Sequence, residues 1–322
     1  MFCIFVDVAM ERLFTIGTPT YNRKDLLLRL YESLKRQTFR DFVWLIVDDG
    51  STDGTKELVE SLIAEGIIEI EYLYQENRGL YYVDKKLYSN ISTKYYVGID
   101  DDDALTPDCL EVFYKEWQNI EKEGKEQIGC IRALSIDERG MVSGDYNVNT
   151  DVGSLDSDYI EMDWIRGKHF ENITCLKSEV YKSVELFNDE DKWLFDKVKV
   201  IYESVFWNRI ARQYKTRYIF VPLRIYYHDA KTSLTRNAFN KQKCYNYVVT
   251  SYLLLNDLRS ERYKNIHRLC KVIGEYWSCV WALKLPLKKA FSMLVNPFDR
   301  ICSLLIIPAA YFVGLKLRSQ FD

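Results

Sequence analysis

Three uninterrupted apolar runs, each followed directly by polar residues, constrain the fold of this chain more than any other feature. They are LFTIGT at 13–18, FVWLIV at 42–47 and YYVGI at 95–99. Between the runs, apolar residues recur at helical spacing over 24–37 and 55–64. Continuous apolar strands are typical of parallel sheets, because helices cover both faces of such sheets. The order of strand, helix and strand with short connections therefore predicts an α/β fold with a mostly parallel central sheet.

A cluster of polar residues follows each of these runs. The clusters are Pro19–Arg23, Asp48–Asp53 and Asp100–Asp103. In an open α/β sheet, ligands bind beyond the carboxyl ends of the strands. Because the carboxyl ends of parallel strands meet at one edge of the sheet, we expect the three clusters to line a single binding site.

The run of four aspartates, Asp100–Asp103, is chemically the most informative of the three clusters. Adjacent carboxylates repel one another and are costly to bury unpaired. In an extended segment residues two apart project to the same side, so Asp100 and Asp102 should converge while Asp101 turns away. Mg²⁺ or Mn²⁺, held by one or two carboxylates and completed by substrate phosphates, would remove the repulsion. The run therefore predicts a divalent-cation site.

Three other interpretations compete with this cation site. A solvated acidic loop does not explain why the run directly follows a buried strand. An EF-hand calcium loop would use Asp108 and Glu111 as later ligands, but Leu105 stands where that loop requires glycine. A phosphate-binding P-loop is disfavoured because the sequence contains no G-x-x-x-x-G-K-[ST].

The C-terminal quarter of the chain differs in charge from the rest. Residues 241–322 hold 13 Lys and Arg against 5 Asp and Glu, whereas the whole chain has a net charge of −3. A basic segment suits a nucleic acid or an anionic membrane surface; we expect the membrane and no nucleic-acid partner. The 8 cysteines form no C-x-x-C pair, which is typical of reduced thiols in a cytoplasmic protein.

Four motifs in the first third of the chain resemble one enzyme family. They are PTYNR at 19–23, IVDDGSTDGT at 46–55, QENRG at 75–79 and IDDDDALTPD at 99–108. In this order they closely resemble the nucleotide-sugar-binding half of family 2 glycosyltransferases, over roughly residues 13–110. The resemblance implies the GT-A fold, in which a nucleotide-binding, Rossmann-like, mostly parallel sheet is flanked by helices.

Beyond residue 110 the similarity is looser. YESVFWNRIARQY at 202–214 looks like the catalytic helix of the family, and YIFVPLRIYYH at 218–228 looks like its last sheet strands. The family usually has a Glu-Asp pair where this chain has Tyr202 and Glu203, so the base would be a longer carboxylate. The family commonly has Ala-Arg-Asn after its N-x-G, where this chain reads VDK at 83–85.

The resemblance implies roles for individual residues. The positions that match the donor-binding motifs of the family are Pro19, Thr20, Tyr21, Arg23, Asp49, Asp100 and Asp101. Lys85 is a further candidate for contact with donor phosphate, with an ordinary surface lysine as the alternative. Asp102 is expected to bind the metal, and His228 is either a second metal ligand or a plain strand-end histidine. Glu203 is expected to be the catalytic base, with a dipole-favoured carboxylate at a helix N-terminus as the alternative.

The function implied by this resemblance is metal-dependent transfer of a sugar with inversion, of the hexosyltransferase type. The donor would be a nucleotide sugar, a UDP-sugar by preference, and the cofactor Mn²⁺ or Mg²⁺. The acceptor would be a hydroxyl of a glycan or a lipid-linked sugar in surface polysaccharide synthesis. The alternatives are a non-catalytic protein that binds nucleotide sugar or glycan, and another metal-dependent transferase such as a nucleotidyltransferase.

We expect three regions along the chain. Residues 1–12 form an N-terminal extension, which lacks the positive segment of a signal peptide. Residues 13–235 form the catalytic domain, in which 13–110 bind the donor and 111–235 form the acceptor half. Residues 236–322 form a basic helical extension.

The acceptor half and the tail contain further features. Residues 146–158 are expected to be a polar loop, and Trp164 is either a core residue or a platform for an acceptor sugar. In the tail, 301–315 carry no charge but include Pro308, which predicts a shallow membrane helix, with a buried helix as the alternative. The protein would then lie peripherally on the cytoplasmic face of the cell membrane.

Overall fold

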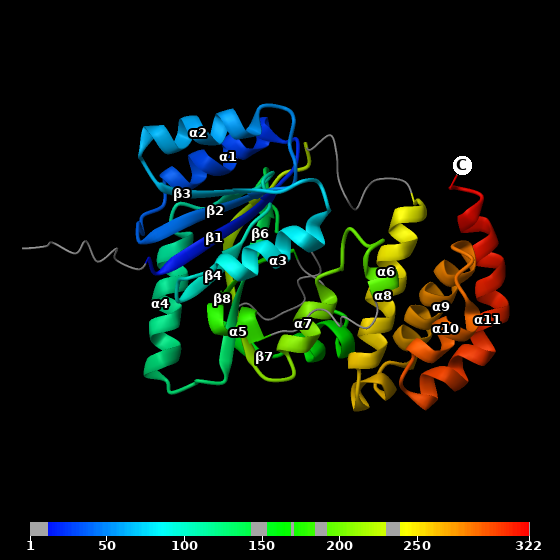
Figure 1. The fold of residues 1–322 in the computed structure, drawn as a ribbon. Helices are drawn as coiled ribbons and strands as arrows, with labels where there is room; N and C mark the ends of the chain where they lie inside the picture. Colours follow the sequence, from blue (N-terminus) through cyan, green and yellow to red (C-terminus); the bar gives the residue numbers. More distant parts are fainter. Residues whose placement is uncertain (1–11, 143–152, 169–170, 184–191, 230–238, 322) are drawn as a thin grey trace, which may run out of the picture.

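The computed structural model describes residues 12–142, 153–168, 171–183, 192–229 and 239–321 (Figure 1). Its centre is a nine-stranded sheet with the order β3-β2-β1-β4-β8-β6-β9-β5, and β7 pairs with β9. The strands are β1 (Phe14–Thr20), β2 (Phe42–Asp48), β3 (Glu69–Tyr74), β4 (Tyr95–Gly98), β5 (Ala104–Leu105), β6 (Ile128–Asp137), β7 (Ser154–Ser157), β8 (Asn172–Lys177) and β9 (Lys215–Tyr226).

The predicted parallel sheet is confirmed. β3, β2, β1 and β4 run parallel to one another, and β6 and β9 run in the same direction because β8 lies antiparallel between β4 and β6. All of β2 and nearly all of β1 are buried, as expected for strands that are covered on both faces. The edge strand β3 alternates between exposed and partly buried residues.

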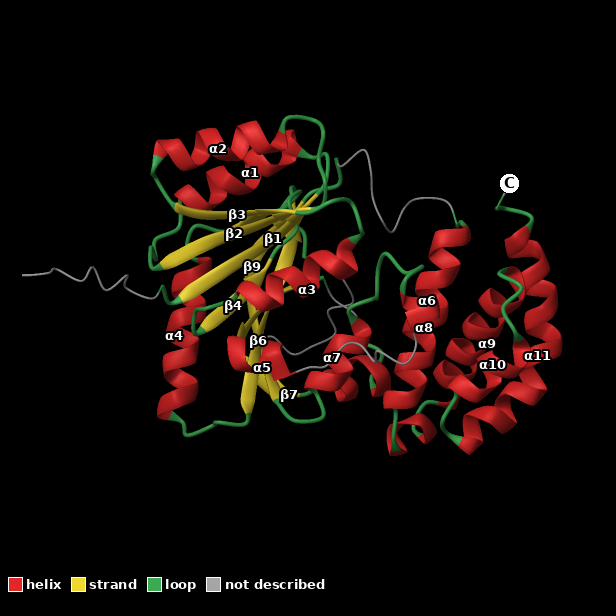
Figure 2. Ribbon diagram, viewed as in Figure 1, coloured by secondary structure: helices red, strands yellow, loops and turns green. Residues whose placement is uncertain are grey.

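Helices cover both faces of the sheet (Figure 2). They are α1 (Lys24–Lys35), α2 (Thr55–Glu65), α3 (Leu80–Asn90), α4 (Cys109–Lys122), α5 (Ser178–Ser183), α6 (Lys192–Phe195) and α7 (Ser204–Ile210), with a π-helix at Ile160–Ile165. Leu27 of α1, Val59 of α2 and Trp117 of α4 pack into one core cluster against one face. Residues of α5 and α7 pack against Tyr96 and Cys130 on the other face.

The C-terminal region is helical. Its helices are α8 (Lys241–Asp257), α9 (Ile266–Ala282), α10 (Leu287–Met293) and α11 (Pro297–Arg318), with a 3-10 turn at Ser260–Tyr263. α8 shares a core cluster with α5 and α7, and Figure 1 shows α9, α10 and α11 on the side of α8 away from the sheet. α11 packs closely on α9 at Gly314, where a Cβ would lie 2.7 Å from the carbonyl oxygen of Ser278.

Two local expectations were wrong. Part of the expected loop 146–158 is strand β7, because Ser154–Ser157 pair with the edge of β9, and residues 146–152 lie outside the described ranges. Pro308 does not interrupt the tail helix, which continues for 22 residues.

Candidate active site

The register of the sheet brings the three polar clusters to one edge. Thr20, at the end of β1, pairs with Asp48 at the end of β2, and Gly17 of β1 pairs with Gly98 at the end of β4. The chain leaves β4 directly into the aspartate run. The expected convergence of the clusters at the carboxyl ends of the strands therefore follows from parallel pairing in register.

Three of the four aspartates point into one small space. Carboxylate oxygens of Asp100, Asp102 and Asp103 lie within 4.8 Å of one another. Asp101 turns away, as its position in an extended segment suggests, and accepts a hydrogen bond of 2.8 Å from the Thr20 hydroxyl. Oxygen ligands from several carboxylates suit a hard divalent cation. Asp103, which sequence reasoning left out of the site, thus belongs to this acidic group.

Two arginines face the acidic run from opposite sides. Nη1 of Arg23 lies 2.9 Å from Oδ1 of Asp101 and 3.1 Å from Oδ2 of Asp102. Nε of Arg224, on β9, lies 2.7 Å from Oδ2 of the fully buried Asp103. Arg224 was not predicted, because nothing in the sequence around it indicates that β9 lies beside the aspartates.

The acidic run remains short of positive charge despite these arginines. Desolvation raises the pKa of Asp100, which still reaches solvent, to about 6 and the pKa of the buried Asp103 to about 7, although Arg224 opposes both shifts. Burial likewise raises the pKa of Asp101 to about 7, against the opposing charge of Arg23. Carboxyl groups that are this reluctant to ionise show that the site would accommodate additional positive charge.

Asp49 organises the loop beyond β3. Its Oδ1 accepts hydrogen bonds from the side chain of Gln75 and the backbone N–H of Arg78, and its Oδ2 accepts one from the backbone N–H of Gly79. These bonds join the VDDGS turn to the QENRG segment and lead into α3. The predicted contact of Asp49 with the donor base stays a prediction.

Glu203 lies just before α7 with an exposed side chain. Nε1 of Trp207, one helical turn later, donates a hydrogen bond of 3.1 Å to its Oε2. Asp84, on α3, shares this space: burial and then the negative charges of Glu203 and Asp100 raise its pKa well above the usual range. Sequence reasoning did not assign Asp84 a role, and the only signal for it was the departure from Ala-Arg-Asn.

The remaining predicted residues are less tightly placed. Tyr21 and Lys85 are exposed, and Pro19 is partly exposed. His228 is exposed, packs edge-on against the ring of Tyr226 and is not part of the acidic group. Trp164 is a core residue: it is fully buried, and its Nε1 donates to the backbone oxygen of Glu261.

Comparisons with known proteins agree on one family. Residues 15–140 match the family model described as Glycosyl transferase family 2. The glycosyltransferase GlyG of Streptococcus pneumoniae serotype 4 is 25% identical over 187 residues, 51% of this chain and 61% of GlyG. The Campylobacter jejuni GalNAc(5)-diNAcBac-PP-undecaprenol beta-1,3-glucosyltransferase is 24% identical over 269 residues, 81% of this chain and 80% of the relative.

Several matches cover only part of the relative. The putative colanic acid biosynthesis glycosyl transferase WcaA of Escherichia coli K12 is 34% identical over 109 residues, which make up 34% of this chain and 39% of WcaA. The match to GlyG likewise covers less than two thirds of that protein's length.

Solved structures show the same fold. Residues 1–349 of Staphylococcus aureus TarS in complex with UDP-GlcNAc superpose with a TM-score of 0.62, covering 96% of this chain and 92% of that chain at 14% identity. The mannosyltransferase PcManGT of Pyrobaculum calidifontis, in complex with GDP-Man and Mn²⁺, superposes with a TM-score of 0.51 at 13% identity. The motifs, the sheet and the match to the family model agree: residues 15–140 form a glycosyltransferase family 2 region, and the chain has the GT-A fold.

Proposed function

We propose that this chain transfers a sugar, with inversion, from a UDP-sugar to a hydroxyl group of a glycan or lipid-linked acceptor, as a hexosyltransferase. One observation supports this most: the acidic group of Asp100, Asp102 and Asp103 lies at the strand edge between the PTYNR loop and β9. Glu203 acts electrostatically on Asp100, so the candidate base faces the same space. The site therefore combines a place for a cation with a place for a base, as glycosyl transfer to a hydroxyl requires.

The donor would bind across the PTYNR loop. Pro19, Thr20 and Tyr21 would line the nucleoside pocket, with Asp49 near the base and Asp101 near the ribose. Arg23 is held by Asp101 and Asp102 in the free protein. A diphosphate carries more negative charge than either carboxyl group, so Arg23 would turn toward it when the donor binds. Lys85 is the less well placed candidate, because it lies exposed on α3.

The acidic group fits a divalent cation. Asp100, Asp102 and Asp103 offer oxygen atoms within 4.8 Å of one another, which suits Mg²⁺ or Mn²⁺. The raised pKa values of Asp100 and Asp103 support the proposal, because a cation would favour their ionised forms. A bound cation would neutralise the charge that develops on the departing diphosphate. Asp102 is our principal proposed ligand. His228 remains a proposed second ligand on the strength of the family resemblance alone.

Glu203 would act as the base. Its carboxylate would take the proton of the acceptor hydroxyl as that oxygen forms a bond to the anomeric carbon of the donor sugar. The bond from the anomeric carbon to the diphosphate oxygen breaks on the opposite side, and UDP leaves with the bonding electrons. Attack opposite the leaving group inverts the anomeric configuration. Trp207 would orient the base by donating to its Oε2.

The experiment that tests this function is a panel of UDP-sugars with Mn²⁺ or Mg²⁺. Thermal stabilisation identifies the donor, because a ligand that binds only the native state raises the melting temperature. Slow release of UDP from the stabilising donor would then show that the site performs chemistry. Binding without release under any acceptor condition would support a non-catalytic sugar-nucleotide-binding protein instead.

The acceptor side would lie close to a membrane. Among the described residues, α11 is the one helix that is long and apolar enough to cross a membrane, with a mean hydropathy of 1.6. Only 17% of its most apolar 18-residue stretch is buried in the protein. Side chains such as Leu304, Leu305 and Phe312 are strongly exposed. We propose that α10 and α11 form a membrane-facing surface on the cytoplasmic side, and that 236–322 function as a membrane-associated region beside the catalytic domain of 13–235.

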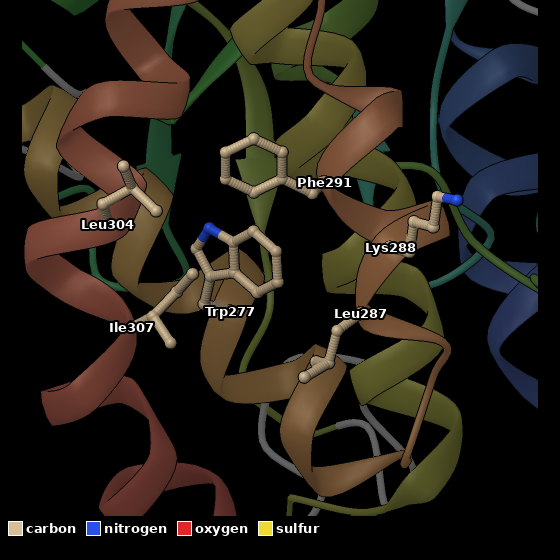
Figure 3. Close-up of a pocket in the computed structure, with 6 residues that line it drawn as sticks. All are labelled: Trp277, Leu287, Lys288, Phe291, Leu304 and Ile307. Atoms are coloured by element: carbon tan, nitrogen blue, oxygen red, sulfur yellow. The ribbon is translucent and has the colours of Figure 1, made fainter.

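An apolar hollow supports this orientation. Trp277, Leu287, Phe291, Leu304 and Ile307 line a cavity of about 310 Å³ between α9, α10 and α11, and Lys288 lies at the same hollow (Figure 3). Exposed apolar side chains next to lysines are the usual composition of an interfacial surface, because the lysines pair with anionic headgroups. A lipid-linked acceptor would then be delivered from this surface.

A further inference from the structure

Arg132, in the middle of β6, is a buried cation to which no carboxylate of the described residues is paired. The residue is only 6% exposed, and its Nε is buried without a hydrogen-bond partner. Within the described ranges it makes neither a hydrogen bond nor an ion pair. Its contacts are aromatic: the guanidinium carbon lies 4.9 Å from the ring centre of Tyr159 and 4.1 Å from that of Trp207. Burying an unpaired charge is costly, so this arrangement calls for a ligand.

The other buried arginines differ from Arg132 in this respect. Arg217, on β9, lies within 2.9 Å of Glu116, Glu123 and Asp156. Arg262 is paired with the buried Asp299. Each of these arginines has the carboxylate partners that a purely structural guanidinium needs. In the described part of the chain, Arg132 is the buried arginine that lacks one.

The position of Arg132 places it beside the active site. It pairs with Thr174 of β8, one register step beyond the pair of Cys175 with Val97, so it is level with Gly98 at the end of β4. Gly98 is exposed although β4 is an interior strand of the sheet, so the surface of the sheet is accessible to solvent at this residue. Arg132 therefore lies two strands, or roughly 10 Å, from the exposed Gly98, after which the chain leads into Asp100.

Arg132 also lies on the same side of the sheet as the candidate base. Cys130, two residues earlier on β6, packs in the core cluster that contains α7, and side chains two apart in a strand share a face. Trp207 touches both groups: its ring stacks on the guanidinium, and its Nε1 donates to Glu203. A ligand whose hydroxyl reaches Glu203 would thus have a cation and two aromatic rings next to it.

We propose that Arg132 binds an anionic group of the acceptor, a carboxylate or a phosphate, beside the hydroxyl that Glu203 deprotonates. This inference rests on the proposed function and adds the chemical class of the acceptor to it. A guanidinium held over two rings, with no carboxylate paired to it among the described residues, keeps its planar N–H groups ready for a bidentate oxyanion. The same rings offer an apolar surface to a sugar. The cost of the unpaired cation in the free protein would be recovered when the anionic acceptor binds.

A purely supporting role for Arg132 makes a different prediction. If the guanidinium only braced Trp207, Arg132→Met would lower the melting temperature and would not change binding of anions relative to neutral analogues. If it serves a ligand, removing a buried unpaired charge should leave the melting temperature unchanged or raise it. Arg132→Lys keeps the charge but loses the planar fork, so it should retain part of the preference for anions.

The test measures binding of small probes to the full-length protein at constant ionic strength. D-glucuronate is compared with D-glucose, and glycerol 3-phosphate with glycerol, by titration calorimetry and by melting temperature. The native protein should bind one anion more tightly than its neutral partner. A preference for D-glucuronate identifies a carboxylate as the ligand, and a preference for glycerol 3-phosphate identifies a phosphate. Arg132→Met should lower the affinity for the preferred anion by about tenfold or more, the loss expected for a charged hydrogen bond. The affinity for the neutral probes should not change. Arg40→Met, at the opposite edge of the sheet, is the matched control and should behave as native.

The outcomes separate this inference from the proposed function. A native protein that binds anionic and neutral probes equally, or binds neither, overturns the anion subsite, as does an Arg132→Met variant that keeps the preference. If Arg132→Met does not fold, the anion subsite is tested by comparing the native protein with Arg132→Lys, which should retain only part of the preference for anions. Stabilisation by UDP with Mn²⁺ is measured in the same samples: its absence from the native protein contradicts the proposed glycosyl transfer, whatever the anion result.

Discussion

Trp207 Nε1 donates a hydrogen bond of 3.1 Å to Oε2 of Glu203, one turn earlier in the chain. The bond fixes an otherwise exposed carboxylate at the start of α7, next to the space that Asp84 and Asp100 share. An exposed glutamate normally samples several rotamers, and a base that must meet an acceptor hydroxyl benefits from losing that freedom. Two predictions follow from this pair.

Replacing the proposed base, Glu203, should separate donor binding from transfer. Glu203→Gln keeps the size of the side chain and its hydrogen bond from Trp207, but an amide cannot accept the proton. We expect transfer to fall by about 10²- to 10⁴-fold, while the melting-temperature shift produced by UDP with Mn²⁺ stays unchanged. Glu60→Gln, on the exposed face of α2, is the control. Native turnover in Glu203→Gln would remove Glu203 from the mechanism.

Replacing the Trp207 indole should lower turnover less than Glu203→Gln does and should leave donor binding unchanged. Trp207→Phe keeps an aromatic ring against Arg132 but removes the N–H donor, so Glu203 loses its orientation. We expect kcat to fall by roughly tenfold, the value of one hydrogen bond to a charged group, with KM for the donor unchanged. Steady-state kinetics over a range of donor concentrations would check this. A rise in donor KM with native kcat would place Trp207 in donor binding instead.

The acidic group should govern metal-dependent binding of the nucleotide. Asp102→Asn removes a charge from the proposed cation site without changing the shape of the residue. We expect the stabilisation by UDP with Mn²⁺ to be lost, while the melting temperature without ligand stays the same or rises because like charges are relieved. Asp41→Asn, before β2 at the opposite edge of the sheet, should keep the native response. An unchanged response in Asp102→Asn would contradict its proposed role as principal ligand.

Arg217 should stabilise the fold in a pH-dependent way. Hydrogen bonds from Arg217 and then Lys125 lower the pKa of Glu123 to about 2, and Arg217 also lowers the pKa of Asp156. For carboxyl groups whose pKa is lower in the folded state, the stabilisation is present above the unfolded pKa and disappears as the pH falls through the folded one.

The variant Arg217→Met would reveal this contribution. At neutral pH we expect its melting temperature to be lower than native by roughly 5 °C or more, because three carboxylates lose their common partner. As the pH falls from about 4.5 toward 2, the difference should shrink, since the carboxylates become protonated in both proteins. Melting curves followed by circular dichroism at several pH values would check this. A difference that stays constant with pH would show that Arg217 acts through packing alone.

The surface formed by α10 and α11 should bind anionic vesicles. Leu305 is 79% exposed on α11, so a charge there should not disturb the core, but it should oppose insertion into a bilayer. We expect Leu305→Glu to reduce co-flotation with vesicles that contain phosphatidylglycerol by several-fold, and neutral vesicles to bind the native protein more weakly. Ile63→Glu, an exposed apolar position on α2, is the control. Equal flotation of the two variants would exclude α11 as the attachment surface.

Local sequence patterns are sufficient to predict the parallel half of the fold and the end of the sheet where the site lies. Continuous apolar runs alternating with helical periodicity leave little choice but a parallel sheet, whose strands must end at a common edge. The alternation of side chains in an extended segment was enough to separate Asp101 from Asp100 and Asp102. These are local rules, which act between residues a few positions apart.

The pairing of charged side chains, by contrast, depends on contacts between distant parts of the chain. Arg224 and Asp103 are more than a hundred positions apart, and they pair because β5 and β9 are neighbours in the sheet. Asp84 comes under the negative charge of Glu203 because α3 and α7 lie over the same face of the sheet. Among the described residues, the printed partners of the Arg132 guanidinium are aromatic rings and not carboxylates. No local sequence pattern specifies these pairs, because the free energy of a buried charged group depends on which distant residues replace the water around it.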